Sequence, residues 1–152
     1  MVRKAYSLIF AFFLIMITSC SREESIQLHD VQGNTVKSTD FKGKWVILNY
    51  WAAWCGSCAA EIPKLNHFYL QNKDKNIIFY GVNFDELPLV DLQQAMKKIN
   101  IAFPVLLENP AALWQLDAVE ALPTTYIINP AGRVVKKMVG MVDEKYLIGI
   151  DK

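Results

Sequence analysis

A pair of cysteines, Cys55 and Cys58, comes just after a nearly continuous apolar run at 45–51, and this order constrains the chain more than any other feature. A nearly continuous apolar run is typical of a strand that is covered on both faces. The order predicts a strand that delivers Cys55 to the first turn of a helix over 57–70. Backbone N–H groups and the helix dipole favour an anion there, so the Cys55 sulfur is expected to ionise easily. A second thiol one turn away predicts dithiol–disulfide exchange.

Two other interpretations of this pair are a static disulfide and half of a zinc site. A structural zinc ion takes four ligands. The sequence has no second pair of closely spaced cysteines and no histidine pair to complete such a site, because its two histidines, His29 and His67, are isolated. Redox chemistry is therefore favoured, and no metal and no cofactor are expected.

Strand and helix patterns alternate along the rest of the chain, which favours an α/β sandwich. The expected helices lie at 57–70, with a bend at Pro63, at 87–99 and at 144–150, with a helical turn at 111–116. The expected strands lie at 26–29, 34–37, 46–51, 76–83, 103–107, 125–128 and 133–139, and a loop is expected at 39–44. The first two strands predict an N-terminal hairpin with a turn at 30–33. The last helix is short, so part of one sheet face should be less covered.

The N-terminal segment has the pattern of an export signal. Arg3 and Lys4 precede thirteen mainly apolar residues at 5–17, fewer than the roughly 20 that a membrane span needs. Small residues then lead to Cys20, in a pattern that resembles the lipobox of bacterial lipoproteins. The predicted organisation is a lipoprotein signal peptide at 1–19, a lipidated cysteine and tether at 20–25, and one domain at 26–152. An uncleaved signal anchor is the alternative, and both place the domain on the periplasmic or extracytoplasmic side of a membrane.

Composition excludes some functions. Sixteen basic residues nearly balance fifteen acidic ones, and no run of Lys or Arg is present, so no nucleic acid partner is expected. If Cys20 carries lipid, both remaining cysteines belong to the redox pair and none is left for a structural disulfide. A monomer is expected.

Several motifs together resemble the thioredoxin superfamily. They are the segment from Trp54 to Cys58, Pro63 in the following helix, Pro123 ahead of a strand, and Gly140 after the last strand. Within that superfamily the chain is most similar to the exported, membrane-tethered TlpA/ResA/DsbE-type thiol–disulfide oxidoreductases. The resemblance implies a thioredoxin-like sandwich with a central mixed sheet, an N-terminal β-hairpin, and a helix-plus-strand insertion before a cis-proline.

The resemblance also assigns roles to the residues of the motif. Cys55 would be the nucleophile that forms a mixed disulfide with a partner, and Cys58 would resolve it. Gly56 and Ser57 would contact the substrate and influence the redox potential of the cysteine pair, with their amides directed toward the Cys55 sulfur. That sulfur is expected at the exposed start of the helix.

Proton transfer would involve Glu61, one helical turn beyond Cys58, where the similar proteins carry an acidic residue. A partly buried carboxyl would have a raised pKa and could exchange protons near neutrality. A solvated helix residue is the alternative for Glu61. Thioredoxin itself has a buried aspartate at the position of Asn49, so that role would pass to Glu61 or to water. Asn49 itself is expected to be a core amide that bonds to the backbone.

Pro123 is expected to be the cis-proline that faces the cysteines, with an ordinary trans proline as the alternative. Leu122 would then offer backbone hydrogen bonds to an incoming peptide. Trp54 is expected in an apolar rim that partners contact, and no chemistry is assigned to Asp85 or Glu86. Three further aromatic residues are expected in the core: Tyr50, Trp51 and Tyr126.

The sequence thus predicts a tethered, net-reducing oxidoreductase that acts on disulfides of extracytoplasmic proteins. The resemblance suggests apocytochrome c as a client and a membrane thiol–disulfide protein as the electron donor. A general disulfide-forming oxidant on the same scaffold is one alternative. A copper-binding assembly factor is another, although such proteins place three residues between their cysteines and add a distant histidine, and none follows His67 here. Peroxidase activity is disfavoured, because the peroxiredoxin nucleophile signature is missing.

Overall fold

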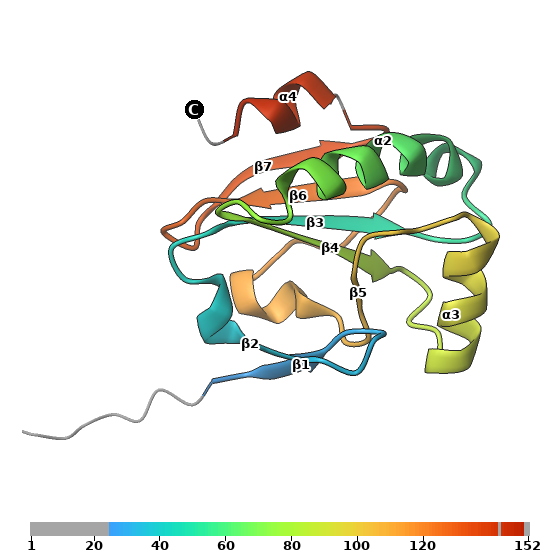
Figure 1. Cartoon of the computed structure of the whole chain (residues 1–152), viewed down its shortest axis with the longest axis horizontal. Helices are drawn as coiled ribbons and strands as arrows, with labels where there is room; N and C mark the ends of the chain where they lie inside the picture. The colour runs from blue at the N-terminus through green and yellow to red at the C-terminus, as the bar shows by residue number, and fades with distance from the viewer. Residues whose placement is uncertain (1–24, 143, 151–152) are drawn as a thin grey trace, which may run out of the picture.

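The computed structural model describes residues 25–142 and 144–150 (Figure 1). The predicted signal peptide and Cys20 lie outside these residues. None of the helices in the described ranges has the length and hydrophobicity that a bilayer span requires.

All the predicted strands and helices are present, with ends displaced by at most two residues. In chain order they are β1 (Gln27–His29), β2 (Thr35–Lys37), η1 (Ser38–Phe41), β3 (Trp45–Trp51), α2 (Gly56–Asn72), β4 (Ile77–Asn83), α3 (Leu89–Lys98), β5 (Val105–Leu106), η2 (Pro110–Trp114), β6 (Thr124–Ile128), β7 (Val134–Val139) and α4 (Glu144–Ile148). The prediction of a loop at 39–44 was wrong in part, because the 3₁₀ helix η1 covers 38–41. Asp40 accounts for this turn, since its carboxylate accepts the Lys37 backbone N–H at 2.8 Å.

The central sheet is mixed, as the resemblance implied. Its strand order is β5-β4-β3-β6-β7, with β3, β4 and β5 parallel and β6 and β7 antiparallel (Figure 1). β3 lies in the middle, where Leu48 is paired with Tyr80 of β4 and with Tyr126 of β6. A strand with neighbours on both sides and layers on both faces explains why the run at 45–51 is apolar except at Asn49.

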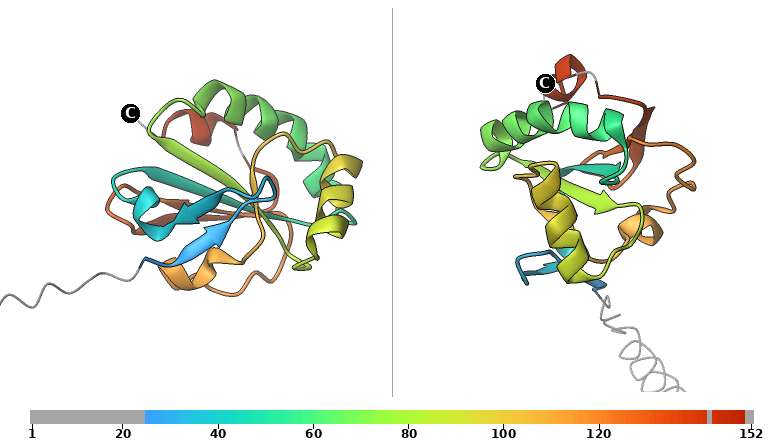
Figure 2. Two further views of the ribbon diagram at one scale, coloured as in Figure 1. Left: turned by 60° about the horizontal axis from the view of Figure 1, so that its bottom comes forward. Right: turned by 90° about the vertical axis from the view of Figure 1, so that its right-hand side faces the viewer.

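Alternate residues of β3 supply two separate cores. Ile47 and Trp51, both 0% exposed, pack with α2, α3 and α4 in what we call the helix-side core. Leu48 and Tyr50 point to the other face and pack with residues of the hairpin and η1 in the hairpin-side core. Figure 2 shows these two layers on opposite sides of the sheet. The prediction that Tyr50, Trp51 and Tyr126 are core residues is confirmed.

The two edges of the sheet are treated differently. The hairpin covers the β5 edge, where the Val31 N–H donates to the Val105 carbonyl at 2.9 Å and the Leu107 N–H to the His29 carbonyl at 2.8 Å. The β7 edge is open, and five of its six residues are exposed. The short helix α4 buries Leu147 in the helix-side core but leaves Val135 46% exposed. This agrees with the expectation that a short last helix would leave part of the sheet less covered.

Candidate active site

The start of α2 positions the Cys55 sulfur. Cys55 is the N-cap residue of this helix, with extended backbone angles (φ −83°, ψ 106°), and its Sγ accepts the backbone N–H of Cys58 at 3.1 Å. Cys58 is the third residue of the helix, so the sulfur takes the place of the side-chain oxygen of a usual N-cap. Because a helix N-terminus favours negative charge, this arrangement stabilises a thiolate at Cys55.

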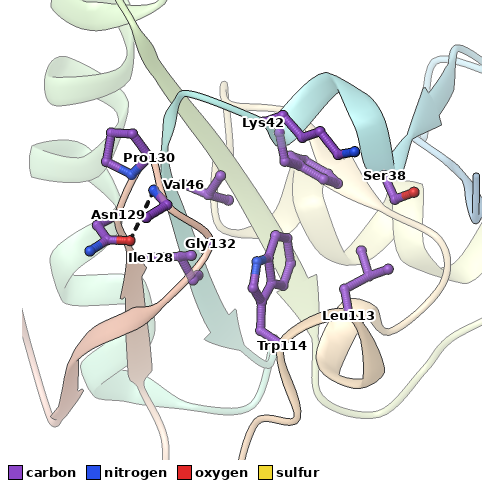
Figure 3. Close-up of a pocket in the computed structure, with 11 residues that line it drawn as sticks. Ser38, Lys42, Val46, Leu113, Trp114, Ile128, Asn129, Pro130 and Gly132 are labelled. Atoms are coloured by element: carbon purple, nitrogen blue, oxygen red, sulfur yellow. Dashed lines mark hydrogen bonds between the residues drawn. The ribbon is translucent and has the colours of Figure 1, made fainter. Parts of the chain in front are cut away.

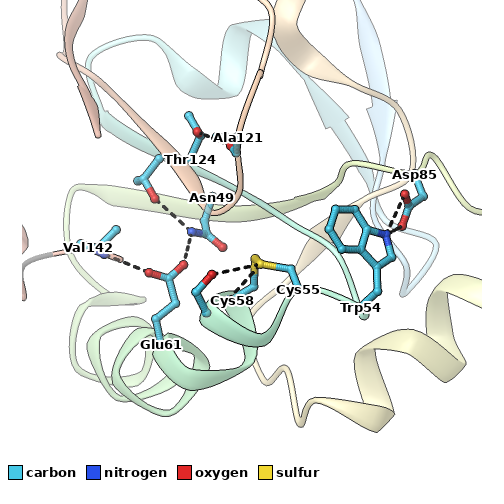
Figure 4. Close-up of a disulfide and its surroundings, with 11 residues drawn as sticks. Asn49, Trp54, Cys55, Cys58, Glu61, Asp85, Ala121, Thr124 and Val142 are labelled. Atoms are coloured by element: carbon cyan, nitrogen blue, oxygen red, sulfur yellow. Dashed lines mark hydrogen bonds between the residues drawn. A yellow bond between two sulfur atoms is a disulfide. The ribbon is translucent and has the colours of Figure 1, made fainter. Parts of the chain in front are cut away.

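The two cysteines are joined in a disulfide with an S–S distance of 2.12 Å (Figure 4). Cys55 is 6% exposed and Cys58 is 0% exposed. The expectation of an exposed Cys55 sulfur was therefore wrong for this oxidised form, because Cys55 packs with Ala52 and Cys58 in the helix-side core. Cys55 nevertheless remains the more accessible of the two, which fits its assignment as the sulfur that partners reach first.

The residues between the cysteines differ in part from expectation. The amide that reaches the Cys55 sulfur belongs to Cys58, and Ser57 contributes its hydroxyl, 3.4 Å from that sulfur. A Cβ added to Gly56 would meet no atom within 4 Å, so open space lies beside the disulfide. Gly56 and Ser57 thus border the place where a partner would approach.

Glu61 is buried beside the redox pair and is 2% exposed. Its Oε1 accepts the Asn49 side-chain N–H at 2.9 Å, and its Oε2 accepts the Val142 backbone N–H at 2.9 Å (Figure 4). Burial raises the pKa of this carboxyl above its ordinary value of 4.5, and the two hydrogen bonds oppose that rise only in part. The alternative of a solvated helix residue is therefore wrong.

Asn49 is fully buried and links three segments of the chain. Its Nδ2 donates to Glu61 and, at 3.0 Å, to Oγ1 of Thr125 on β6. The expectation that Asn49 bonds to the backbone was wrong, since both partners are side chains. Thr125 and Val142 were missed by the sequence analysis. They lie 76 residues from Asn49 and 81 residues from Glu61, and no local pattern marks either.

The Leu122–Pro123 peptide bond is cis, as predicted. The Pro123 carbonyl accepts the backbone N–H of Gly140 at 2.8 Å, and Gly140 has a φ of +91°, which favours glycine. Thr124 closes the turn from the other side, because its hydroxyl donates to the Ala121 carbonyl at 2.7 Å. The segment before β6 is thereby held to the end of β7, and Leu122 is half-buried against both cores.

Trp54 lies at the rim of the site and is 66% exposed. Its indole N–H donates to both carboxylate oxygens of Asp85, at 3.1 and 3.0 Å (Figure 4). Asp85, to which the sequence assigned no chemistry, therefore fixes the orientation of a large aromatic surface. Phe84, next to Asp85 in the chain, is also exposed, at 43%. Trp54 and Phe84 thus offer exposed apolar surface to a polypeptide partner.

A separate pocket of about 460 Å³ lies beside the start of β3 (Figure 3). It is lined by apolar side chains that include Phe41, Val46 and Trp114. Val46 is at the start of β3, whereas Cys55 follows its end, and a seven-residue strand spans roughly 20 Å. Neither Cys55 nor Cys58 lines this pocket, so the redox site does not share it.

Within the described ranges, no group of three or more His, Cys, Asp or Glu residues is placed to hold a metal ion. A copper site at Cys55 and Cys58 would need a further ligand that these residues do not supply.

Comparisons with known proteins agree with this geometry. The AhpC/TSA family matches residues 22–137. The thiol-disulfide oxidoreductase ResA of Bacillus subtilis is 33% identical over 131 residues, which cover 86% of this chain and 73% of ResA.

Two solved structures extend the similarity to the fold. The exposed lipoprotein thioredoxin of Streptococcus pneumoniae superposes with a TM-score of 0.68 at 26% identity, covering 82% of this chain and 95% of that one. A thiol:disulfide interchange protein of Chlorobium tepidum gives a TM-score of 0.66 at 26% identity, covering 80% and 86%. The chain thus belongs to the AhpC/TSA family and, within it, is a ResA-like thiol–disulfide oxidoreductase.

Proposed function

We propose that this protein is a net reductant of disulfides in extracytoplasmic proteins, tethered to a membrane by lipid on Cys20. One observation supports the catalytic part of this proposal. The Cys55 sulfur occupies the N-cap position of α2, and its partner Cys58 is fully buried one helical turn from Glu61. Apocytochrome c, whose haem-attachment motif is itself a CxxCH sequence, is the client that the family resemblance suggests. A membrane thiol–disulfide protein would return electrons to the site.

The reaction begins with the Cys55 thiolate of the reduced protein. It attacks a client disulfide, which forms a Cys55–client bond and releases the other client sulfur as a thiolate. Cys58 then gives its proton to the Glu61 carboxylate and attacks the Cys55 sulfur. The Cys55–Cys58 bond forms, and the second client sulfur leaves. In total, two electrons pass from the dithiol to the client disulfide. The two client thiolates then take up two protons, one released by Glu61 and one from the solvent that received the Cys55 proton.

Glu61 suits the role of proton acceptor for Cys58. It lies one helical turn beyond this cysteine, and burial raises its pKa. A raised pKa brings a carboxyl closer to the operating pH, where it can both take up and release a proton. The neighbouring amide of Asn49 cannot accept a proton in this way.

A client peptide would lie between two segments that flank the disulfide. The backbone of Leu122, before the cis-proline, would bond to the peptide on one side. Trp54, held by Asp85, would contact it on the other side. Gly56 leaves the space between them open.

The proposed tether and the redox site lie at opposite ends of the domain. Ile26, the second described residue, hydrogen-bonds to Ser38 through its N–H, at 3.1 Å, and through its carbonyl, at 2.8 Å. Ser38 borders the pocket at the start of β3, whereas Cys55 follows the end of that strand. A lipid on Cys20 would therefore leave the disulfide directed away from the membrane. One relative, the exposed lipoprotein thioredoxin of Streptococcus pneumoniae, is named as a lipoprotein.

The direction of electron transfer and the order in which the two cysteines react can be tested with a synthetic disulfide peptide that contains a CxxCH motif. The reduced wild-type protein should reduce it, and the Cys58→Ala variant should stop at a protein–peptide mixed disulfide through Cys55, seen by mass spectrometry. Cys55→Ala is the matched control and should form at least tenfold less adduct, because Cys58 is fully buried. Adducts on Cys55→Ala but not on Cys58→Ala would overturn the assigned roles. An oxidised protein that instead converts the dithiol peptide to its disulfide at equilibrium would favour the oxidant alternative.

Anchoring can be tested with Cys20→Ala in the full chain expressed in a bacterium with lipoprotein processing. The wild-type protein should carry a lipid mass on Cys20 after removal of residues 1–19 and sediment with membranes. The variant should lose both the lipid and the cleavage. A wild-type chain that keeps residues 1–19 and carries no lipid would instead show the uncleaved signal anchor.

The protonation of Glu61 predicts a pH dependence of stability. Because burial raises its pKa, the folded protein holds this proton more tightly than the unfolded chain, so stability should fall as the pH rises from 4.5 through the raised pKa. The expected slope is at most about 1.4 kcal/mol per pH unit, and Glu61→Gln should remove it. The measurement is urea unfolding of the oxidised protein between pH 4.5 and 8. Glu120→Gln, at an exposed position, serves as control and should keep the wild-type slope. Parallel curves for wild type and Glu61→Gln would contradict this account of the carboxyl.

A further inference from the structure

One buried acceptor near the disulfide has no hydrogen-bond donor. Among the described residues, three buried side-chain atoms lack a partner: Asn49 Oδ1, Trp51 Nε1 and Asn83 Nδ2. Two of these are donors, so Asn49 Oδ1 is the single acceptor in the set. A buried polar atom without a partner costs about 1–3 kcal/mol, so such an atom calls for an explanation.

The orientation of the Asn49 amide follows from the chemistry of its neighbours. When Glu61 is ionised, its carboxylate can only accept, so the amide nitrogen faces it, and the same nitrogen reaches Thr125. The carbonyl oxygen is then turned to the other side. In Figure 4 this side faces the Cys55–Cys58 disulfide.

The oxidised protein has no hydrogen-bond donor for Asn49 Oδ1, and reduction of the disulfide creates one. A disulfide sulfur carries no hydrogen, whereas opening the bond places an S–H group on Cys58. Cys58 and Asn49 are both 0% exposed, so water cannot readily serve either group. When Cys55 is bonded to a client, its sulfur no longer offers a thiolate to Cys58, and the Asn49 carbonyl is the unpartnered acceptor on that side.

We propose that Asn49 is a positioning residue whose carbonyl accepts the Cys58 thiol hydrogen once the disulfide opens, so that it favours the dithiol over the disulfide. In the balanced step, a reducing dithiol gives two electrons and two protons, the Cys55–Cys58 bond breaks, and the donor becomes a disulfide. One proton ends on Cys58, where Asn49 holds it, and the other is shared between Cys55 and solvent. The same amide holds Glu61 through its nitrogen, so it places the thiol and its proton acceptor next to each other. The inference rests on the dithiol exchange described above and adds a determinant of its equilibrium.

The test is the equilibrium constant for oxidation of the Cys55–Cys58 pair in glutathione buffers. Asn49→Leu keeps the branching and the number of side-chain heavy atoms and removes the acceptor, so the equilibrium should shift about fivefold toward the disulfide, the effect of one net hydrogen bond of roughly 1 kcal/mol. At about 30 mV per tenfold change, this is a fall of about 20 mV in potential. Thr125→Val is the matched control, because it removes a partner of the same amide but leaves the carbonyl, and it should change the equilibrium less than twofold.

Two further arms separate this role from the alternatives. The fivefold shift should persist when Asn49→Leu is made in the Glu61→Gln background, because it acts through the thiol. An equilibrium that is unchanged, or shifted toward the dithiol, would overturn the proposal. A wild-type protein that fails to exchange with glutathione at all would instead contradict the proposed reductase function.

A measurement on the unmutated active site guards against variants that do not fold. The infrared S–H band of reduced wild-type protein, identified by its loss in Cys58→Ala, should lie at the lower frequency of a hydrogen-bonded thiol. Labelling the Asn49 carbonyl with ¹³C should reveal a band that shifts between the oxidised and reduced protein. A free S–H frequency together with an unchanged carbonyl band would also overturn the proposal.

Discussion

The bond from the Cys58 backbone N–H to the Cys55 sulfur is the interaction on which the chemistry of this protein depends. It exists because β3 ends at Trp51 and α2 begins at Gly56, with Cys55 as the cap between them. β3 can hold that position because it is paired on both sides and packed on both faces. The packing around β3 thus positions the first turn of α2 beside the Cys55 sulfur. The N–H groups of this turn have no partner within the helix.

A second set of contacts surrounds the resolving cysteine and joins distant parts of the chain. Glu61 of α2 is bonded to Asn49 of β3 and to the backbone of Val142 after β7, and Asn49 reaches Thr125 of β6. In a buried network of this kind, every polar group that lacks a hydrogen-bond partner destabilises the folded state. The network therefore ties the protonation of one carboxyl to the packing of the sheet and of the segment that leads to α4.

The sequence predicted the order of the elements well, because strand and helix patterns are local. The nearly continuous apolar run of β3 and the spacing of Leu92 and Met96 in α3 were sufficient to place those elements. α3 begins two residues later than predicted because Pro88 takes the cap position. The turn η1 was missed, since it depends on one carboxylate, Asp40, that reaches back to the Lys37 amide.

The site was predicted less completely, for a physical reason. Cys55, Cys58 and Glu61 share one helix, so their spacing could be read directly, whereas the burial of Glu61 depends on segments far along the chain. The partners of Asn49 likewise come from tertiary packing, as does the contact of Trp54 with Asp85, 31 residues away. Long-range contacts between polar side chains leave no periodic signal in a single sequence.

The most direct test of this account is the pH dependence of alkylation at Cys55 in the Cys58→Ala variant. The rate of reaction with iodoacetamide should reach half its maximum at a pH well below about 8.5, the value of an ordinary thiol, because the helix start stabilises the thiolate. A half-maximum at or above that pH would contradict the claim that the start of α2 activates this sulfur.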